Sequence, residues 1–179
     1  MNRIFFITLI YCILLTCWSC KQGQTDEGIK DTFEDQDEML VRINKYLVRK
    51  DVELIESYAK RRGWNITQTE SGLFYEIYEE GSGDSARDGR KVTINYTLSL
   101  LDGTICYSSD ESGPKTFRLG RSREESGLEQ GLLMMQAGDK AHLILPPHLA
   151  YGLLGDEDRI PARSIIVYDV ELLTVDSSQ

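Results

Sequence analysis

The residue types that most often carry catalysis are few and scattered in this sequence. The chain has two histidines, His142 and His148, and four cysteines, of which Cys106 alone lies beyond residue 20. A metal site needs three or four closely spaced ligands of this kind. Gly83-Asp84-Ser85 is similar to a hydrolase nucleophile turn, but no histidine follows at a suitable place. The sequence therefore predicts no metal site, no nucleophile and no cofactor.

Cys20 offers a different chemistry, which is acylation by lipid. It stands between an uncharged run, Ile4 to Ser19, and a polar stretch. As a helix this run would span roughly 24 Å, which is short of the ~30 Å hydrocarbon core and typical of a signal peptide. Residues 1–19 are therefore predicted to be a lipoprotein signal peptide, with Cys20 as the lipidated N-terminus. Cys17 as the lipid site, a plain secretory signal and an uncleaved anchor remain alternatives.

Charge and cysteine content narrow the partners and the basis of the fold. The net charge of −9 repels phosphate backbones, so no nucleic acid partner is expected. Once the signal peptide is removed and Cys20 is acylated, Cys106 is left alone and no disulfide framework is predicted. The fold must then depend on its hydrophobic core, for which 41% hydrophobic residues suffice.

The elements that precede the candidate domain are a tether and a helical segment. Residues 20–36 are polar and acidic, which predicts a flexible tether. Residues 37–64 carry two amphipathic stripes, which predict two short helices with Asp51 as a cap and Gly63 as the terminator. The stripes are Met39, Leu40, Ile43, Tyr46 and Leu47, then Val52, Ile55, Tyr58 and Ala59. Each stripe needs a partner, which is the following domain, a second copy or an envelope complex.

Residues 65–179 change to the alternation that is typical of strands. Strands are predicted at 73–79, 92–100, 104–109, 116–119, 141–145 and 165–173, with a hairpin turn at Asp102-Gly103. Ser126-Gly127-Leu128-Glu129 has the pattern of a capping box that opens a helix. An antiparallel sheet wrapped over one short helix is an α+β fold. We expect residues 70–175 to fold without the segment before them.

A series of short blocks in this region follows one order and spacing. The blocks are Val92–Tyr96, Phe117-Arg118-Leu119-Gly120, Gly127-Leu128-Glu129-Gln130-Gly131, Gly138-Asp139-Lys140-Ala141, Leu145–Gly152, Ile160-Pro161 and Val167–Leu172. They resemble FKBP-type peptidyl-prolyl cis-trans isomerases. The resemblance implies an FKBP-like sheet over one helix and an enzyme that rotates prolyl bonds in exported or envelope polypeptides. The signal peptide, lipid cysteine, helical segment and single domain together resemble the lipid-anchored extracytoplasmic FKBPs of Bacteroidetes, including those linked to gliding motility.

The resemblance also implies a substrate cleft. The residues that match its walls are Tyr96, Phe117, Leu128, Tyr151, Ile160 and Tyr168, with Tyr151 donating to a substrate carbonyl and Leu128 in place of a floor tryptophan. Four further residues would contact substrate but depart from the family pattern: Cys106, Tyr107, Glu124 and Glu125. Two adjacent glutamates at the lip would favour a basic residue beside the proline. These changes leave two hypotheses, an isomerase of altered preference or a binding module and chaperone with little turnover.

Overall fold

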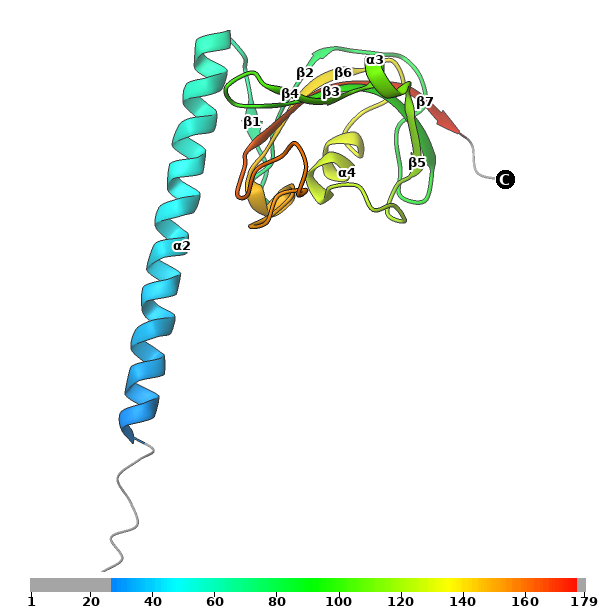
Figure 1. The fold of residues 1–179 in the computed structure, drawn as a ribbon. Helices are drawn as coiled ribbons and strands as arrows, with labels where there is room; N and C mark the ends of the chain where they lie inside the picture. Colours follow the sequence, from blue (N-terminus) through cyan, green and yellow to red (C-terminus); the bar gives the residue numbers. More distant parts are fainter. Residues whose placement is uncertain (1–26, 177–179) are drawn as a thin grey trace, which may run out of the picture. The chain divides into compact units, whose positions relative to one another are not determined.

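The computed structural model describes the backbone of residues 27–176 and the side chains of residues 38–176 (Figure 1). The predicted signal peptide and Cys20 lie outside the described residues. The chain divides into two units, with the second running from Val48 to Gln179. Within residues 27–176, no helix is both long enough and apolar enough to cross a membrane.

One long helix, α2 (Glu27–Arg62), replaces the two predicted short helices. No glycine or proline lies between Leu47 and Val52, so nothing in the backbone interrupts the helix there. Asp51 is therefore an internal residue and no cap, and the predicted tether 20–36 is helical from Glu27 onward. The predicted terminator is confirmed, since the helix stops before Gly63, whose φ is 71°.

The second unit is built on a single antiparallel sheet. Its strands are β1 (Thr67–Gln68), β2 (Phe74–Glu79), β3 (Lys91–Leu100), β4 (Ile105–Ser108), β5 (Lys115–Arg118), β6 (Lys140–Leu145) and β7 (Ile166–Asp176). Their order is β1-β2-β6-β7-β3-β4, with β5 also paired to β3. The predicted α+β class is confirmed, and so is the Asp102-Gly103 hairpin between β3 and β4. The short helices α3 (Ser109–Ser112) and η1 (Pro147–Leu149) follow β4 and β6.

The sheet has an apolar core on each face. On β6, Leu143 and Leu145 belong to the larger core, which also contains the side chains of α4, whereas Ile144 belongs to a smaller core with Ile55 and Tyr58 of α2. The first residues of β7 are apolar on both faces because each face of this strand packs against one of the two cores. The second helical stripe thus packs on the same chain. In the first unit, by contrast, the side chains of Met39, Leu40, Ile43 and Tyr46 are exposed.

Helix α4 (Ser126–Leu132) packs closely on the concave side of the sheet (Figure 1). A Cβ on Gly127 would lie 2.5 Å from Leu145 Cγ, and one on Gly131 would lie 2.4 Å from Leu143 Cδ1, so only glycine allows this approach. The predicted capping box is wrong, because the N-cap position is Glu125 and makes no side-chain cap. Glu129 instead accepts from Ser122 Oγ at 2.6 Å, which ties the preceding loop to the helix.

Candidate functional site

The structure brings the predicted cleft residues together from across the second unit. Cys106, Leu128, Ile160 and Tyr168 are buried members of the larger core, and Tyr96, Tyr107, Phe117 and Tyr151 pack against it half-buried. They come from β3, β4, β5, α4, β7 and the 150–165 loop between η1 and β7. The rings of Tyr96 and Tyr168 lie 5.9 Å apart between centroids. The structure therefore places these eight residues in or against one core.

The two glutamates differ from the expectation of free carboxylates at an exposed lip. Glu125 Oε2 accepts a hydrogen bond of 2.9 Å from Tyr168 Oη. Glu124 Oε2 lies 2.5 Å from Lys115 Nζ, and the Glu124 side chain is only 15% exposed. Because Lys115 pairs with Glu124 and Tyr168 donates to Glu125, neither carboxylate is a free partner for a basic residue beside a substrate proline.

Both tyrosine hydroxyls near Glu125 stay protonated at neutral pH. Burial first, and then the Glu125 charge, raise the pKa of Tyr168 well above its usual value. Burial, followed by a hydrogen bond to Glu125 and its charge, also raises the pKa of Tyr151. Each hydroxyl is therefore a neutral donor, and the Glu125 carboxylate is a charged acceptor near both.

Solvent exposure separates the wall of the site from its support. Leu128 has 0% exposure and Ile160 has 2%, so a prolyl ring can reach them only after neighbouring side chains move. The thiol of Cys106 is also buried; it lies against the carbonyl oxygens of Thr104 and Arg159, at 3.9 and 3.6 Å, in place of a substrate contact. Among the predicted cleft residues, Tyr96, Tyr107, Phe117 and Tyr151 are half-buried and remain partly accessible to solvent.

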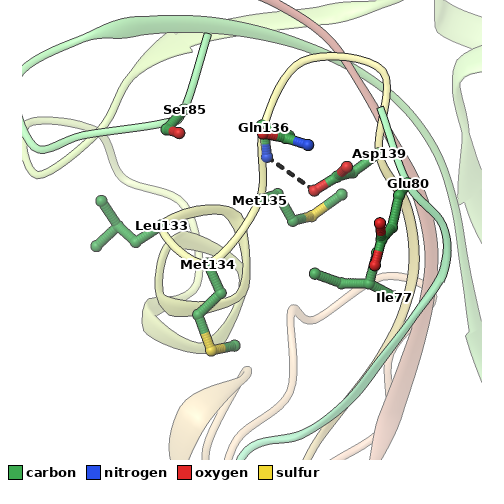
Figure 2. Close-up of a pocket in the computed structure, with 8 residues that line it drawn as sticks. All are labelled: Ile77, Glu80, Ser85, Leu133, Met134, Met135, Gln136 and Asp139. Carbon is green, nitrogen blue, oxygen red and sulfur yellow. Dashed lines mark hydrogen bonds between the residues drawn. The ribbon is translucent and has the colours of Figure 1, made fainter. Parts of the chain in front are cut away.

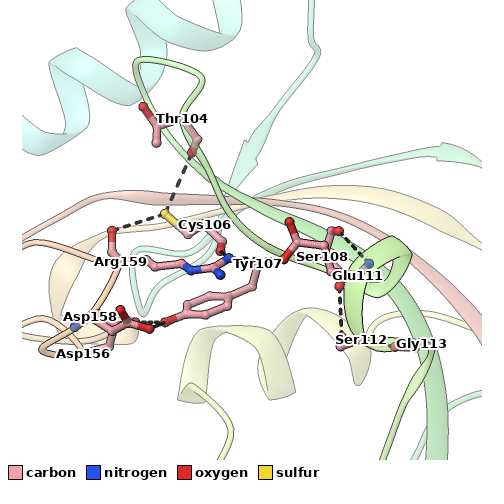
Figure 3. A network of polar contacts seen from close by, with 10 residues as sticks. All are labelled: Thr104, Cys106, Tyr107, Ser108, Glu111, Ser112, Gly113, Asp156, Asp158 and Arg159. Carbon is pink, nitrogen blue, oxygen red and sulfur yellow. Dashed lines mark hydrogen bonds and ion pairs between the residues drawn. The ribbon is translucent and has the colours of Figure 1, made fainter.

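Tyr107 belongs to a polar network that the sequence did not reveal (Figure 3). Its hydroxyl donates to Asp156, whose other oxygen accepts from the backbone N–H of Ile160 at 2.7 Å. Arg159 donates to the Cys106 carbonyl at 2.7 Å and pairs with Glu111 at 3.2 Å. The signals in the sequence were the acidic run at 156–158 and the departure of Tyr107 from the family pattern. The network ties β4 to the 150–165 loop.

A hollow of about 340 Å³ lies beside the C-terminal end of α4 (Figure 2). It is lined by Ile77, Glu80, Ser85, Leu133, Met134, Met135, Gln136 and Asp139. None of these residues was predicted for the cleft, and the carboxylate of Asp139 is satisfied by the backbone N–H groups of Gln136 and Gly81. Among the residues that the structure describes, no three histidine, cysteine or acidic side chains gather as metal ligands would.

Comparison with known proteins then assigns the family. The model of FKBP-type peptidyl-prolyl cis-trans isomerases matches residues 83–173, a range that contains every predicted cleft residue. The chain belongs to this family. Its fold is accordingly the FKBP fold, and its family reaction is peptidyl-prolyl cis-trans isomerisation.

Individual FKBP relatives extend beyond the matched range. FK506-binding protein 2 of Yarrowia lipolytica is 39% identical over 113 residues, which are 63% of this chain and 78% of that protein. FkpA of Aeromonas hydrophila is 34% identical over 161 residues, 85% of this chain but only 58% of FkpA. The crystal structure of FkpA from Escherichia coli superposes with a TM-score of 0.63 at 28% identity, and the match covers 97% of this chain and 83% of that one. The chain is thus similar to FkpA over its helical segment as well as its FKBP domain.

Proposed function

We propose that this protein isomerises prolyl bonds in exported or envelope polypeptides. The observation that carries the proposal is the aromatic wall of Tyr96, Phe117 and Tyr151 over an apolar core, inside the range that matches the isomerase family. The substrate is a proline-containing segment of an incompletely folded chain. No cofactor takes part in the proposed reaction.

The proposed reaction needs an environment and no nucleophile. Rotation of an X–Pro bond loses amide resonance over a barrier of about 18–20 kcal/mol. The twisted amide has less charge separation than the planar one, so an apolar wall favours it. A ten-thousandfold acceleration requires only about 5.5 kcal/mol of such preference. In this proposal the neutral Tyr151 hydroxyl leaves Glu125 and donates to a substrate carbonyl.

A protease-coupled or NMR-exchange assay on X–Pro peptides tests this function. Wild type should accelerate isomerisation, and Tyr151→Phe should lower kcat/KM about two- to tenfold, the equivalent of one neutral hydrogen bond. Tyr78→Phe is the matched control, because the Tyr78 hydroxyl donates to Asp169 away from the proposed wall. Peptide binding without any acceleration by wild type would make the domain a binding module or chaperone.

We also propose that the mature protein is held at the bacterial cell envelope by lipid on Cys20. The uncharged run before Cys20 and the polar residues after it support this. The same layout, with a helical segment and one FKBP domain, supports the narrower kinship with Bacteroidetes lipoproteins. Intact-mass analysis of the membrane fraction should find acyl groups on Cys20, whereas acylation of Cys17 or an unlipidated soluble form would contradict the proposal.

The partner that we propose for residues 37–47 is a second copy of this chain. Met39, Leu40 and Ile43 are exposed and share one face of α2, which suits pairing of two like helices. Light scattering of the mature protein should give a dimer that Ile43→Asp dissociates. Lys45→Asp, on a different face, should leave it intact. A monomeric wild type would instead favour docking into an envelope complex.

A further inference from the structure

A largely buried ion pair joins α2 to the 150–165 loop. Arg163 Nη2 lies 2.8 Å from Asp51 Oδ2, and the Asp51 side chain is only 8% exposed. By comparison, both side chains of the Arg159–Glu111 pair are about half exposed. Removing one partner of a buried pair leaves the other charge without compensation, so the two groups hold each other strongly in place.

The backbone of Arg163 is fixed as well as its side chain. Its φ of 57° lies in the left-handed region, which residues other than glycine rarely adopt. Its N–H donates to the carbonyl oxygen of Gly152 at 3.1 Å, which closes the loop across its base. A strained residue persists where the surrounding contacts determine its conformation. Asp51 supplies the contact from α2 that holds the Arg163 side chain, while Tyr107 and Arg159 tie an earlier part of the loop to β4.

The closed loop carries two residues of the site. Tyr151 directly precedes Gly152, and Ile160 lies three residues before Arg163. Within the loop, the backbone N–H of Asp156 donates to Ile160 O at 3.1 Å, so movement at the Arg163 end reaches the site through few bonds. The α2 end of the pair is rigid, because Ile55 and Tyr58 are buried against the sheet.

We propose that Asp51 is a positioning residue for the site, acting through Arg163 to hold the loop that carries Tyr151 and Ile160. The inference deepens the proposed isomerase function and rests on it. It makes turnover depend on a helix that lies outside the range matched by the family model, residues 83–173. Burial opposes the charge of Asp51, and its pKa is raised by that burial although Arg163 acts to lower it. A carboxylate kept in this setting fits a requirement for placement more than one for stability.

The test uses the full mature chain and conservative substitutions. Asp51→Asn keeps the shape of the side chain but removes its charge. Arg163→Met and Arg163→Lys must both adopt the left-handed φ of Arg163, but only Lys keeps the positive charge. Hydrogen exchange of peptides covering 150–165 and kcat/KM for an X–Pro peptide are measured for each variant. Glu79→Gln is the control, since it breaks the exposed Lys140–Glu79 pair on β2 and β6.

Asp51→Asn and Arg163→Met should each lower kcat/KM roughly tenfold, mainly through KM, because a misplaced wall binds substrate poorly. Exchange in the 150–165 loop should rise about tenfold while exchange in β6 and β7 stays unchanged. Arg163→Lys should restore most of both properties. If Asp51→Asn does not fold, Asp51→Glu, which shifts the charge by one methylene, takes its place and should raise loop exchange and KM.

The proposal is overturned if the charge-removing variants match Glu79→Gln in loop exchange and kcat/KM, whatever their melting temperature. It is also overturned if Arg163→Lys behaves like Arg163→Met. An inactive wild type would refute the proposed function alone, because loop exchange still reports whether Asp51 holds the loop.

Discussion

At the residue scale, Glu125 is the charged acceptor that acts on the tyrosine hydroxyls of the candidate site. Its carboxylate accepts a hydrogen bond from Tyr168. Burial is the largest cause that raises the pKa of Tyr151, and Glu125 is the next. A hydrogen bond to a charged acceptor is worth about 1.5–3 kcal/mol and one to a neutral carbonyl about 0.5–1.5 kcal/mol. If Tyr151 donates to a substrate carbonyl, as we propose, that carbonyl competes against a stronger acceptor.

Weakening that acceptor should raise turnover. Glu125→Gln replaces the charged acceptor by a neutral one. The energy difference between the hydrogen bond of Tyr151 to residue 125 and its hydrogen bond to a substrate carbonyl then narrows by about 1 kcal/mol, which should raise kcat/KM roughly fivefold. The measurement is peptide turnover at constant temperature, normalised to folded protein. Glu124→Gln is the matched control, because Glu124 pairs with Lys115 and should give no comparable rise.

The buried position of Leu128 predicts a cost in stability for a larger side chain at this position. Resemblance to the family suggests that tryptophan at this position would restore a floor and raise activity. Leu128 is fully buried, however, so Leu128→Trp should overpack the core and reduce the free energy of unfolding by about 1–3 kcal/mol. Urea unfolding measures this. An unchanged midpoint, with higher turnover, would show that the floor opens without cost.

Sequence patterns locate these residues but not their exposure. Tyr96, Phe117 and Tyr151 could be assigned to one neighbourhood because each block matches a family block. The inward turn of Glu125 and the pairing of Tyr107 with Asp156 could not, because they depend on contacts between segments far apart in the chain. Side chains that differ from the family pattern are where the resemblance gives least guidance.

At the element scale, the helices were harder to predict than the strands. The strand periods and the Asp102-Gly103 turn are local, and the structure reproduces them. Asp51 follows the pattern of an N-cap, but its carboxylate pairs with Arg163, which is 112 residues away. Glu129 follows the pattern of a capping box, but it binds Ser122. In both cases the side chain binds a partner in another segment and does not cap its own helix.

The C-terminal half of α2 contributes side chains to the smaller core, which bears on the expectation that residues 70–175 fold without it. Ile55 is fully buried, whereas its neighbour Leu54 is 47% exposed. Ile55→Ala should therefore lower the free energy of unfolding by about 2–5 kcal/mol, because it leaves a cavity. Leu54→Ala, the matched control, should change it by about 0.5 kcal/mol or less. Denaturant unfolding of the otherwise unchanged protein measures both. Equal effects would mean that α2 does not contribute to the core.

At the scale of the domain, burial on both faces of the sheet leaves several tyrosine hydroxyls in shielded positions. Burial is the leading cause that raises the pKa of Tyr58, Tyr78, Tyr151 and Tyr168. These residues lie on both sides of the sheet, with Tyr58 in the smaller core and Tyr168 in the larger one. The distribution follows from a sheet that is covered by α4 on one face and by the end of α2 on the other.

Such tyrosines should make the fold sensitive to alkali. In the unfolded chain a tyrosine ionises near pH 10, whereas these groups keep their protons in the folded domain to higher pH. Above pH 10 the unfolded state has therefore lost protons that the folded state retains, and the free energy of unfolding falls as pH rises. Each such group contributes at most about 1.4 kcal/mol per pH unit to the slope, between its unfolded and its folded pKa, and almost nothing below pH 9. Urea unfolding between pH 8 and pH 11.5 measures the slope. Tyr151→Phe should reduce the slope of the free energy of unfolding against pH by about 1.4 kcal/mol per pH unit above pH 10. Below pH 9 the slope should stay unchanged. An identical slope for wild type and variant above pH 10 would show that Tyr151 ionises as freely in the folded domain as in the unfolded chain, and would contradict its burial beside Glu125.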